Sequence, residues 1–232
     1  MVSAMRLAAL LCALASAGPA FAGSVMKEPP ADPDKSARYL FYMHGASVEH
    51  GQPVEGVAVE YEAILKAFAD RGFTAMGERR GPVANNDYAR KIAGQVRALL
   101  AAGVPGANIA VAGHSKGVAI ALIVSSMVQN DAVAYANLAG CAPRGVPGLA
   151  GSERMYQYTV ENMAPAMSGR LLSAFDKADK VAQSCKEVFD RAQRLKEKKE
   201  LLLATGKGHA LFARPEKIWI ELVVAWAEGR SS

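Results

Sequence analysis

The sequence contains few of the residues that build metal sites. Its 232 residues include only three cysteines and four histidines. Neither residue type recurs at Cys-x-x-Cys or His-x-x-x-His spacing, which is typical of zinc ligands. We therefore expect no metal site and no cofactor.

A large excess of charge of one sign is also lacking. The chain carries 27 lysines and arginines against 22 aspartates and glutamates, and the two signs are interspersed. Nucleic-acid-binding proteins segregate their basic residues, so we expect no nucleic-acid partner and a small-molecule substrate instead. With 51% hydrophobic residues, the chain has the composition of one soluble globular domain.

The N-terminus has the pattern of a targeting segment. Arg6 precedes the apolar run LAALLCALASAGPA, and Ala20-Phe21-Ala22 follows as an Ala-x-Ala cleavage pattern. This order is typical of a cleavable secretory signal peptide, and the run is too short to span a bilayer. We expect residues 1–22 to be removed, no integral membrane segment in the mature chain, and a secreted or periplasmic location.

Export changes what the cysteines predict. Without residues 1–22, only Cys141 and Cys185 remain. Two cysteines in an oxidising compartment favour one disulfide bond. Free buried thiols are the alternative.

The rest of the chain alternates between apolar runs and helical patterns. Residues 23–37 are polar and proline-rich and predict an extended leader, which leaves one domain over residues 38–232. Strand-like runs occupy residues 38–43, 73–78, 108–113, 132–140, 170–175 and 200–205, and helical patterns occupy residues 61–72, 88–103, 117–129, 184–195 and 216–228. Continuously apolar strands separated by helices predict an α/β fold, a three-layer α/β/α sandwich with a mostly parallel sheet of about six strands.

Parallel sheets of this kind bind their ligands at the carboxyl ends of the strands. Ser115 is the first candidate catalytic residue at such an end. It stands in the sequence AGHSKG, a Gly-x-Ser-x-Gly motif between an apolar strand and an apolar helix. Gly113 and Gly117 allow the turn to be tight, and the following helix N-terminus favours negative charge. This context predicts a catalytic nucleophile, with a non-catalytic turn serine as the alternative.

A base and an acid follow Ser115 in the chain order Ser, Asp, His. His209 comes after the last strand and is the predicted general base. Asp176 and Asp179 both follow the fifth strand. An orienting carboxylate usually lies a few residues past its strand, which favours Asp179, with Asp176 as the alternative.

An oxyanion hole requires two backbone N–H donors. We expect one from Lys116, directly after the nucleophile, and the other from Ala46 in the loop after the first strand. His44-Gly45 would set the path of that loop.

Four segments resemble the α/β-hydrolase superfamily of serine hydrolases, and compact exported, dienelactone-hydrolase-like members in particular. They are FYMHGAS (41–47), AGHSKG (112–117), AFDKADKV (174–181) and GKGHALF (206–212). The resemblance implies a Ser-Asp-His triad. Two departures stand out, because the usual first two antiparallel strands are missing and residues 142–170 leave room for only a small lid.

The predicted rim is rich in basic residues, which predicts an anionic substrate. Ordinary surface charges are the alternative. The basic residues are Arg79, Arg80, Lys116, Arg144, Lys177, Lys180 and Lys207. We assign His44, Arg79, Arg80 and Lys207 to substrate binding.

The predicted activity is hydrolysis of an ester, thioester or amide bond through an acyl-enzyme. A catalytically inactive hydrolase fold used for binding is the alternative.

Overall fold

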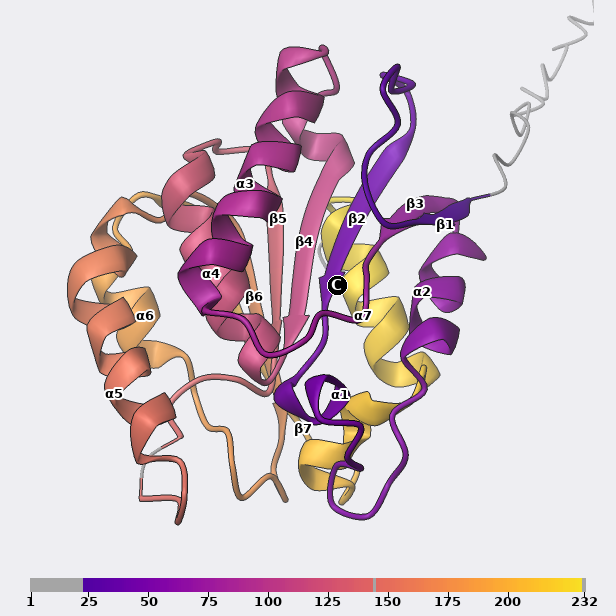
Figure 1. Cartoon of the computed structure of the whole chain (residues 1–232). Coiled ribbons are helices and arrows are strands. Elements are labelled where there is room, and N and C mark those ends of the chain that lie inside the picture. The colour runs from indigo at the N-terminus through magenta and orange to yellow at the C-terminus, as the bar shows by residue number, and fades with distance from the viewer. Residues whose placement is uncertain (1–22, 144, 231–232) are drawn as a thin grey trace, which may run out of the picture.

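A computed structural model describes residues 23–143 and 145–230. The expected signal peptide, residues 1–22, lies outside the described residues, and so does Arg144. Within them, seven parallel strands form one sheet in the order β1-β3-β2-β4-β5-β6-β7 (Figure 1). The predicted fold class is confirmed.

The bounds of the elements follow the apolar runs of the sequence. The strands are β1 (Ser24–Met26), β2 (Arg38–Met43), β3 (Phe73–Met76), β4 (Ile109–His114), β5 (Ala134–Leu138), β6 (Gly169–Asp176) and β7 (Leu195–Leu203). The α-helices are α1 (Ala46–Glu49), α2 (Tyr61–Ala69), α3 (Asn85–Ala101), α4 (Lys116–Val128), α5 (Ala150–Tyr158), α6 (Lys186–Arg191) and α7 (Lys217–Ala227). None of these helices is long and apolar enough to cross a membrane.

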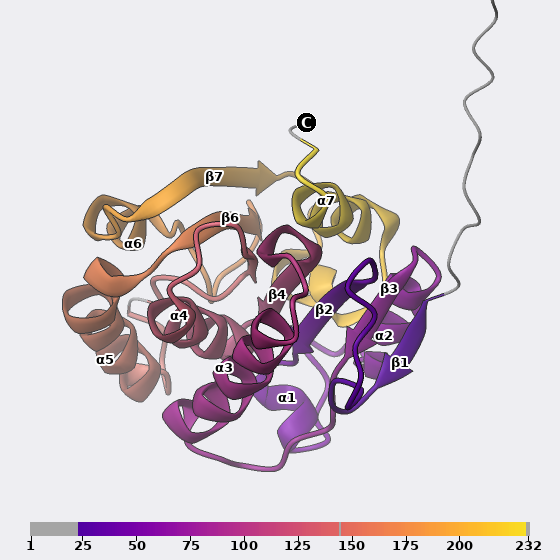
Figure 2. The ribbon, with the colours of Figure 1, turned by 90° about the horizontal axis from the view of Figure 1, so that it is seen from above.

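Alternate residues of each strand pack on opposite faces of the sheet. In β2, Tyr39, Phe41 and Met43 join the core beneath α3 and α4, whereas Leu40 and Tyr42 join the core beneath α2 and α7. Figure 2 shows these two pairs of helices on opposite sides of the sheet. Burial on both faces explains why the strands are continuously apolar in sequence.

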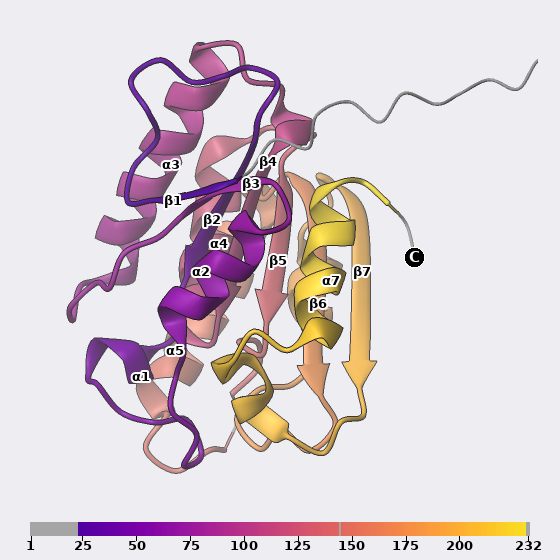
Figure 3. The same cartoon turned by 90° about the vertical axis from the view of Figure 1, so that its right-hand side faces the viewer.

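The chain reverses direction across the sheet between β2 and β4. From β2 the chain passes to β3 on one side, and from β3 it returns to β4 on the other side of β2. The loops that follow β2 and β4 therefore separate at the carboxyl edge, where doubly wound sheets bind their ligands. In Figure 3 the arrowheads of β5, β6 and β7 point toward this edge, near which α1 lies.

Besides the unpredicted helices α1 and α5, the structure differs from the sequence prediction at two places. Three residues of the expected leader, Ser24–Met26, form β1 and pair in parallel with β3 at the edge of the sheet. In addition, β7 begins at Leu195, inside a segment that was predicted to be helical, and α6 ends at Arg191. The first difference adds a seventh strand to the predicted six.

Candidate active site

Ser115 lies on a sharp turn between β4 and α4. Its backbone has φ 53° and ψ −117°, in the left-handed region that side chains rarely adopt. The turn is possible because residues 113 and 117 are glycines, which let the neighbouring backbone approach closely. A Cβ at Gly117 would overlap the Met43 carbonyl oxygen, and one at Gly113 would overlap the carbonyl of Gly117. This strained turn holds the half-buried serine at the carboxyl edge of the sheet.

His209 and Asp179 form a hydrogen-bonded pair at the same edge. Nδ1 of His209 lies 2.9 Å from Oδ2 of Asp179, whose side chain is fully buried. Oδ1 of Asp179 accepts hydrogen bonds from the backbone N–H groups of Val181 (2.7 Å) and Ala182 (2.9 Å). With the carboxylate accepting a hydrogen bond from Nδ1–H, Nε2 of His209 is left as the acceptor.

Asp176 has a different set of partners. Its Oδ2 accepts from the Thr205 N–H and hydroxyl, both at 2.7 Å, and its Oδ1 accepts from the N–H groups of Ala178 (2.9 Å) and Gly208 (3.3 Å). Burial acts to raise the pKa of Asp176, but these hydrogen bonds outweigh it and hold the pKa below the usual value. Asp176 therefore joins the end of β6 to the loop that leads to His209.

The ring of His114 connects the Ser115 turn with His209. The centroids of the His114 and His209 rings are 4.8 Å apart. Burial, followed by the nearby His209, holds the pKa of His114 well below its usual value, so the ring stays neutral. Within the described residues no hydrogen bond joins the Ser115 hydroxyl to His209; in enzymes such bonds frequently tighten only when substrate binds.

A cavity of about 330 Å³ opens beside Ser115. Its walls come from the loop after β2, from α4 and from α5, and they are largely apolar. They include Ala46, Lys116, Ala119, Leu122, Met155 and Tyr156. The segment predicted to form a small lid therefore supplies one wall through α5.

None of the four predicted substrate-binding residues lines this cavity. His44 and Arg80 are buried, 1% and 5% exposed, and bound to each other. Burial, followed by the charge of Arg80, lowers the pKa of His44 to about 4. Arg79 pairs with Glu62, and Lys207 pairs with Glu216.

Sequence reasoning did not identify Glu49, the last residue of α1. Its carboxylate contacts both Arg80 and Lys116. The only signal was an acidic residue six positions after β2 on an otherwise basic rim, and nothing in the pattern indicated its burial.

Cys141 and Cys185 form the predicted disulfide bond, with Cα atoms 5.1 Å apart. Both residues are buried. The bridge joins the loop after β5 to the start of α6, and the Cys141 carbonyl also accepts from the Gln183 N–H (2.9 Å). The disulfide bond thus connects one wall of the cavity to the segment that carries Asp179.

The described residues contain no cluster of three or more side chains that could hold a metal ion.

Known structures share this arrangement of strands and helices. No protein-family model matches the sequence, and no curated protein matches it in a sequence search. A structure from work on LipS and LipT, two metagenome-derived lipolytic enzymes, aligns over 83% of this chain and 94% of that chain, with a TM-score of 0.59 and 15% identity. A lipase-esterase related protein from Clostridium acetobutylicum aligns over 83% and 96%, with a TM-score of 0.52 and 15% identity. The chain has the α/β-hydrolase fold.

A third α/β-hydrolase structure, the thioesterase domain from the curacin biosynthetic pathway, aligns over 82% of this chain and 92% of that chain, with a TM-score of 0.50 and 10% identity. In this fold a nucleophilic serine lies on a strand-to-helix turn, and the acid and the histidine follow it in the chain. In this chain Ser115 lies on the turn between β4 and α4, and Asp179 and His209 follow β6 and β7 in that order.

Proposed function

We propose that this chain is a serine hydrolase that cleaves an ester, thioester or amide bond through an acyl-enzyme intermediate. Ser115 is the nucleophile, His209 the general base and Asp179 the acid that orients His209. The observation that carries the proposal is the 2.9 Å hydrogen bond between His209 and Asp179, next to a serine on a strained turn. A turn serine without a catalytic role would need no such pair beside it.

The reaction follows from these positions. Nε2 of His209 takes the proton from the Ser115 hydroxyl as Oγ attacks the carbonyl carbon of the substrate. The tetrahedral intermediate collapses, the scissile bond breaks, and the leaving alcohol, thiol or amine takes the proton from His209. Water then attacks the acyl-enzyme by the same route and releases the acid.

The negative charge of the intermediate needs two donors. Lys116 is the first residue of α4, and the first N–H groups of a helix have no partner within it. Its N–H and that of Ala46, which also lines the cavity, are the proposed pair. A single donor of this kind lowers the barrier by about 3 kcal/mol.

The cavity favours an uncharged acyl group. Four of the basic side chains that suggested an anionic substrate are paired with carboxylates: Arg79 with Glu62, Arg80 and Lys116 with Glu49, and Lys207 with Glu216. These pairs weaken the attraction for an anion, although Arg80 and Lys116 share Glu49 and leave one net positive charge there. We therefore propose a short or medium apolar acyl chain in the cavity, a chemistry in keeping with the lipolytic and esterase-related proteins of the same fold.

A panel of p-nitrophenyl esters with acyl chains of increasing length tests the proposal. The wild type should hydrolyse them, and Ser115→Ala should lower kcat by about 10⁴-fold or more. Ser126→Ala is the matched control, because Ser126 also belongs to α4 and its hydroxyl donates to the Ile123 carbonyl. Binding of the esters without turnover by the wild type would favour the inactive binding protein instead.

A further inference from the structure

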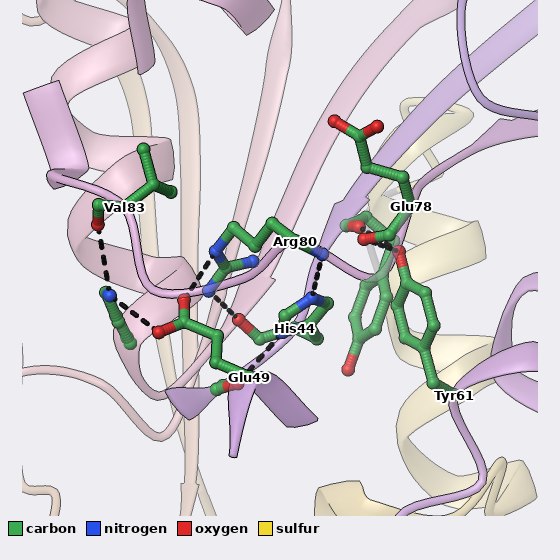
Figure 4. Close-up of polar contacts among 9 residues, drawn as sticks. His44, Glu49, Tyr61, Glu78, Arg80 and Val83 are labelled. Atoms are coloured by element: carbon green, nitrogen blue, oxygen red, sulfur yellow. Dashed lines mark hydrogen bonds and ion pairs between the residues drawn. The ribbon is translucent and has the colours of Figure 1, made fainter. Parts of the chain in front are cut away.

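The Glu49 carboxylate joins three segments that follow three neighbouring strands. Glu49 itself belongs to the segment after β2. Its Oε1 lies 2.8 Å from Nε of Arg80, which follows β3, and its Oε2 lies 2.8 Å from Nζ of Lys116, which follows Ser115 and β4. In Figure 4, Glu49, Arg80 and His44 converge at the carboxyl edge of the sheet.

Burial makes this network different from a surface ion pair. The side chains of Glu49 and Arg80 are 1% and 3% exposed, and that of Lys116 is 26% exposed. Water screens such a pair far less than it screens an exposed one. Removing one partner of a buried pair leaves the charge of the other buried and unpaired, which costs free energy. The folded protein therefore favours the arrangement in which these charges stay in contact.

Arg80 also bonds His44, and so links the Glu49 network to the backbone that leads to Ala46. Its backbone N–H donates to Nε2 of His44 (3.0 Å), and its Nη2 donates to the His44 carbonyl. Because Nε2 accepts, Nδ1 carries the proton and donates to the Gly45 carbonyl (2.9 Å). The path of residues 44–46 is thereby fixed against the nucleophile, since a Cβ at Gly45 would lie only 3.1 Å from the Cβ of Ser115.

Lys116 anchors the other side. Its Nζ donates to Glu49 (2.8 Å) and to the Val83 carbonyl (3.2 Å). The same residue supplies the first proposed oxyanion donor through its backbone N–H. Glu49 thus contacts a side chain of one donor residue directly, and through Arg80 and His44 it fixes the backbone that leads to the other.

We infer that Glu49 is a positioning residue that holds the two oxyanion donors, the N–H groups of Lys116 and Ala46, at the spacing the tetrahedral intermediate requires. This inference rests on the proposed function. The Glu49 side chain is buried and Glu49 does not line the cavity, so it acts through Lys116 and Arg80 rather than on the substrate. Small displacements of donors weaken transition-state binding more than substrate binding.

Glu49→Gln and Lys116→Met test the inference. Each removes the ion pair between the two segments, and Lys116→Met keeps the backbone N–H. We expect each to lower kcat for a p-nitrophenyl ester by about 10- to 100-fold while KM changes by less than about 3-fold. The double variant should be little worse than either single one, because both remove the same interaction.

The control is Glu221→Gln, which removes the partly exposed pair between Glu221 of α7 and Arg71 and should leave kcat unchanged. If Glu49→Gln does not fold, Lys116→Met carries the test, since its side chain is partly exposed. Unchanged kcat in the folded variants, with an active wild type, would overturn the role of Glu49 alone. A wild type that neither hydrolyses esters nor reacts with a fluorophosphonate would overturn the proposed function and this inference with it.

Discussion

At the residue scale, two aspartates three positions apart have separate tasks because their partners differ. Asp179 presents one carboxylate oxygen to His209 and is held by two backbone N–H groups. Both carboxylate oxygens of Asp176 accept hydrogen bonds, from Thr205, Ala178 and Gly208. The first arrangement suits an acid that orients the proposed base, and the second stabilises a turn.

Asp179→Asn and Asp176→Asn should therefore fail in different ways. Asn at position 179 offers His209 an amide that can favour the wrong tautomer, so kcat should fall by about 10³- to 10⁴-fold with little change in stability. Asn at position 176 should lower the free energy of unfolding by about 2–3 kcal/mol, because N–H donors lose an ionised acceptor. Ester kinetics and urea unfolding of both variants measure the two effects. The reverse pattern would make Asp176 the acid.

The sequence predicted Ser115 through its motif and His209 through its position after the last strand, and their catalytic roles stay predictions. Sequence reasoning could not identify the buried state of Arg80, because Arg80 follows β3 whereas its partner Glu49 comes from the segment after β2. A basic residue after a strand looks the same in sequence whether it faces solvent or a buried carboxylate. The expected basic rim and its anionic substrate stay a prediction, although the pairing of Arg80 with the buried Glu49 carboxylate weakens it.

At the element scale, α4 and α5 determine what fits beside Ser115. Ala119 lies one turn along α4 from the nucleophile and lines the cavity, as Met155 of α5 does. A larger side chain at position 119 would shorten the space available to an acyl chain.

Ala119→Leu should shift the preference toward shorter acyl chains. We expect kcat/KM for octanoyl esters to fall by about 10-fold or more, because one or two misplaced methylenes change binding by about 1–3 kcal/mol, while acetyl esters are affected little. A series of p-nitrophenyl esters measures the shift. Equal losses for all chain lengths would mean that the acyl chain lies elsewhere.

The disulfide bond is an element-scale constraint, since it closes a segment of 44 residues between the loop after β5 and α6. The chain-entropy model gives about 4 kcal/mol for such a loop. The double variant Cys141→Ala/Cys185→Ala should therefore melt about 10 °C below the wild type in calorimetry. A melting temperature unchanged by the double substitution would show that the bridge adds nothing to stability.

The missed strand β1 has a physical explanation at this scale. It contains three residues and lies at the edge of the sheet, with Ser24 and Val25 exposed. So short an edge strand needs no apolar alternation, and its pairing with β3 is decided by contacts far away in the chain. The central strands were predictable because both of their faces are buried.

At the scale of the whole molecule, the parallel sheet brings residues from distant parts of the chain to one edge. The order of the strands was not readable from the sequence, but the rule that chemistry lies at the carboxyl ends placed the candidate residues correctly at that edge. The disulfide bond is compatible with export. The secreted or periplasmic location stays a prediction.

Stability of the whole molecule should fall as the pH drops from about 6.5 toward 4. Burial lowers the pKa of His44 to about 4 and that of His114 well below its usual value, whereas both histidines titrate normally in the unfolded chain. The unfolded state therefore binds more protons in this window, and each histidine lowers the free energy of unfolding by up to about 1.4 kcal/mol per pH unit.

Urea unfolding at pH 7.5, 6 and 5 checks this dependence. His44→Gln should reduce the slope of the unfolding free energy against pH, since one of the two titrating groups is gone. A wild-type free energy that is constant between pH 7.5 and 5 would mean that neither ring is kept neutral by the fold.

The most direct measurement of the central claim is covalent labelling by a fluorophosphonate, followed by mass spectrometry of the modified peptide. An activated serine displaces fluoride and gains one phosphonyl group. We expect one label per chain, on Ser115, with labelling abolished in Ser115→Ala and strongly slowed in His209→Gln. Failure of the folded wild type to react, or a label on another residue, would contradict the account.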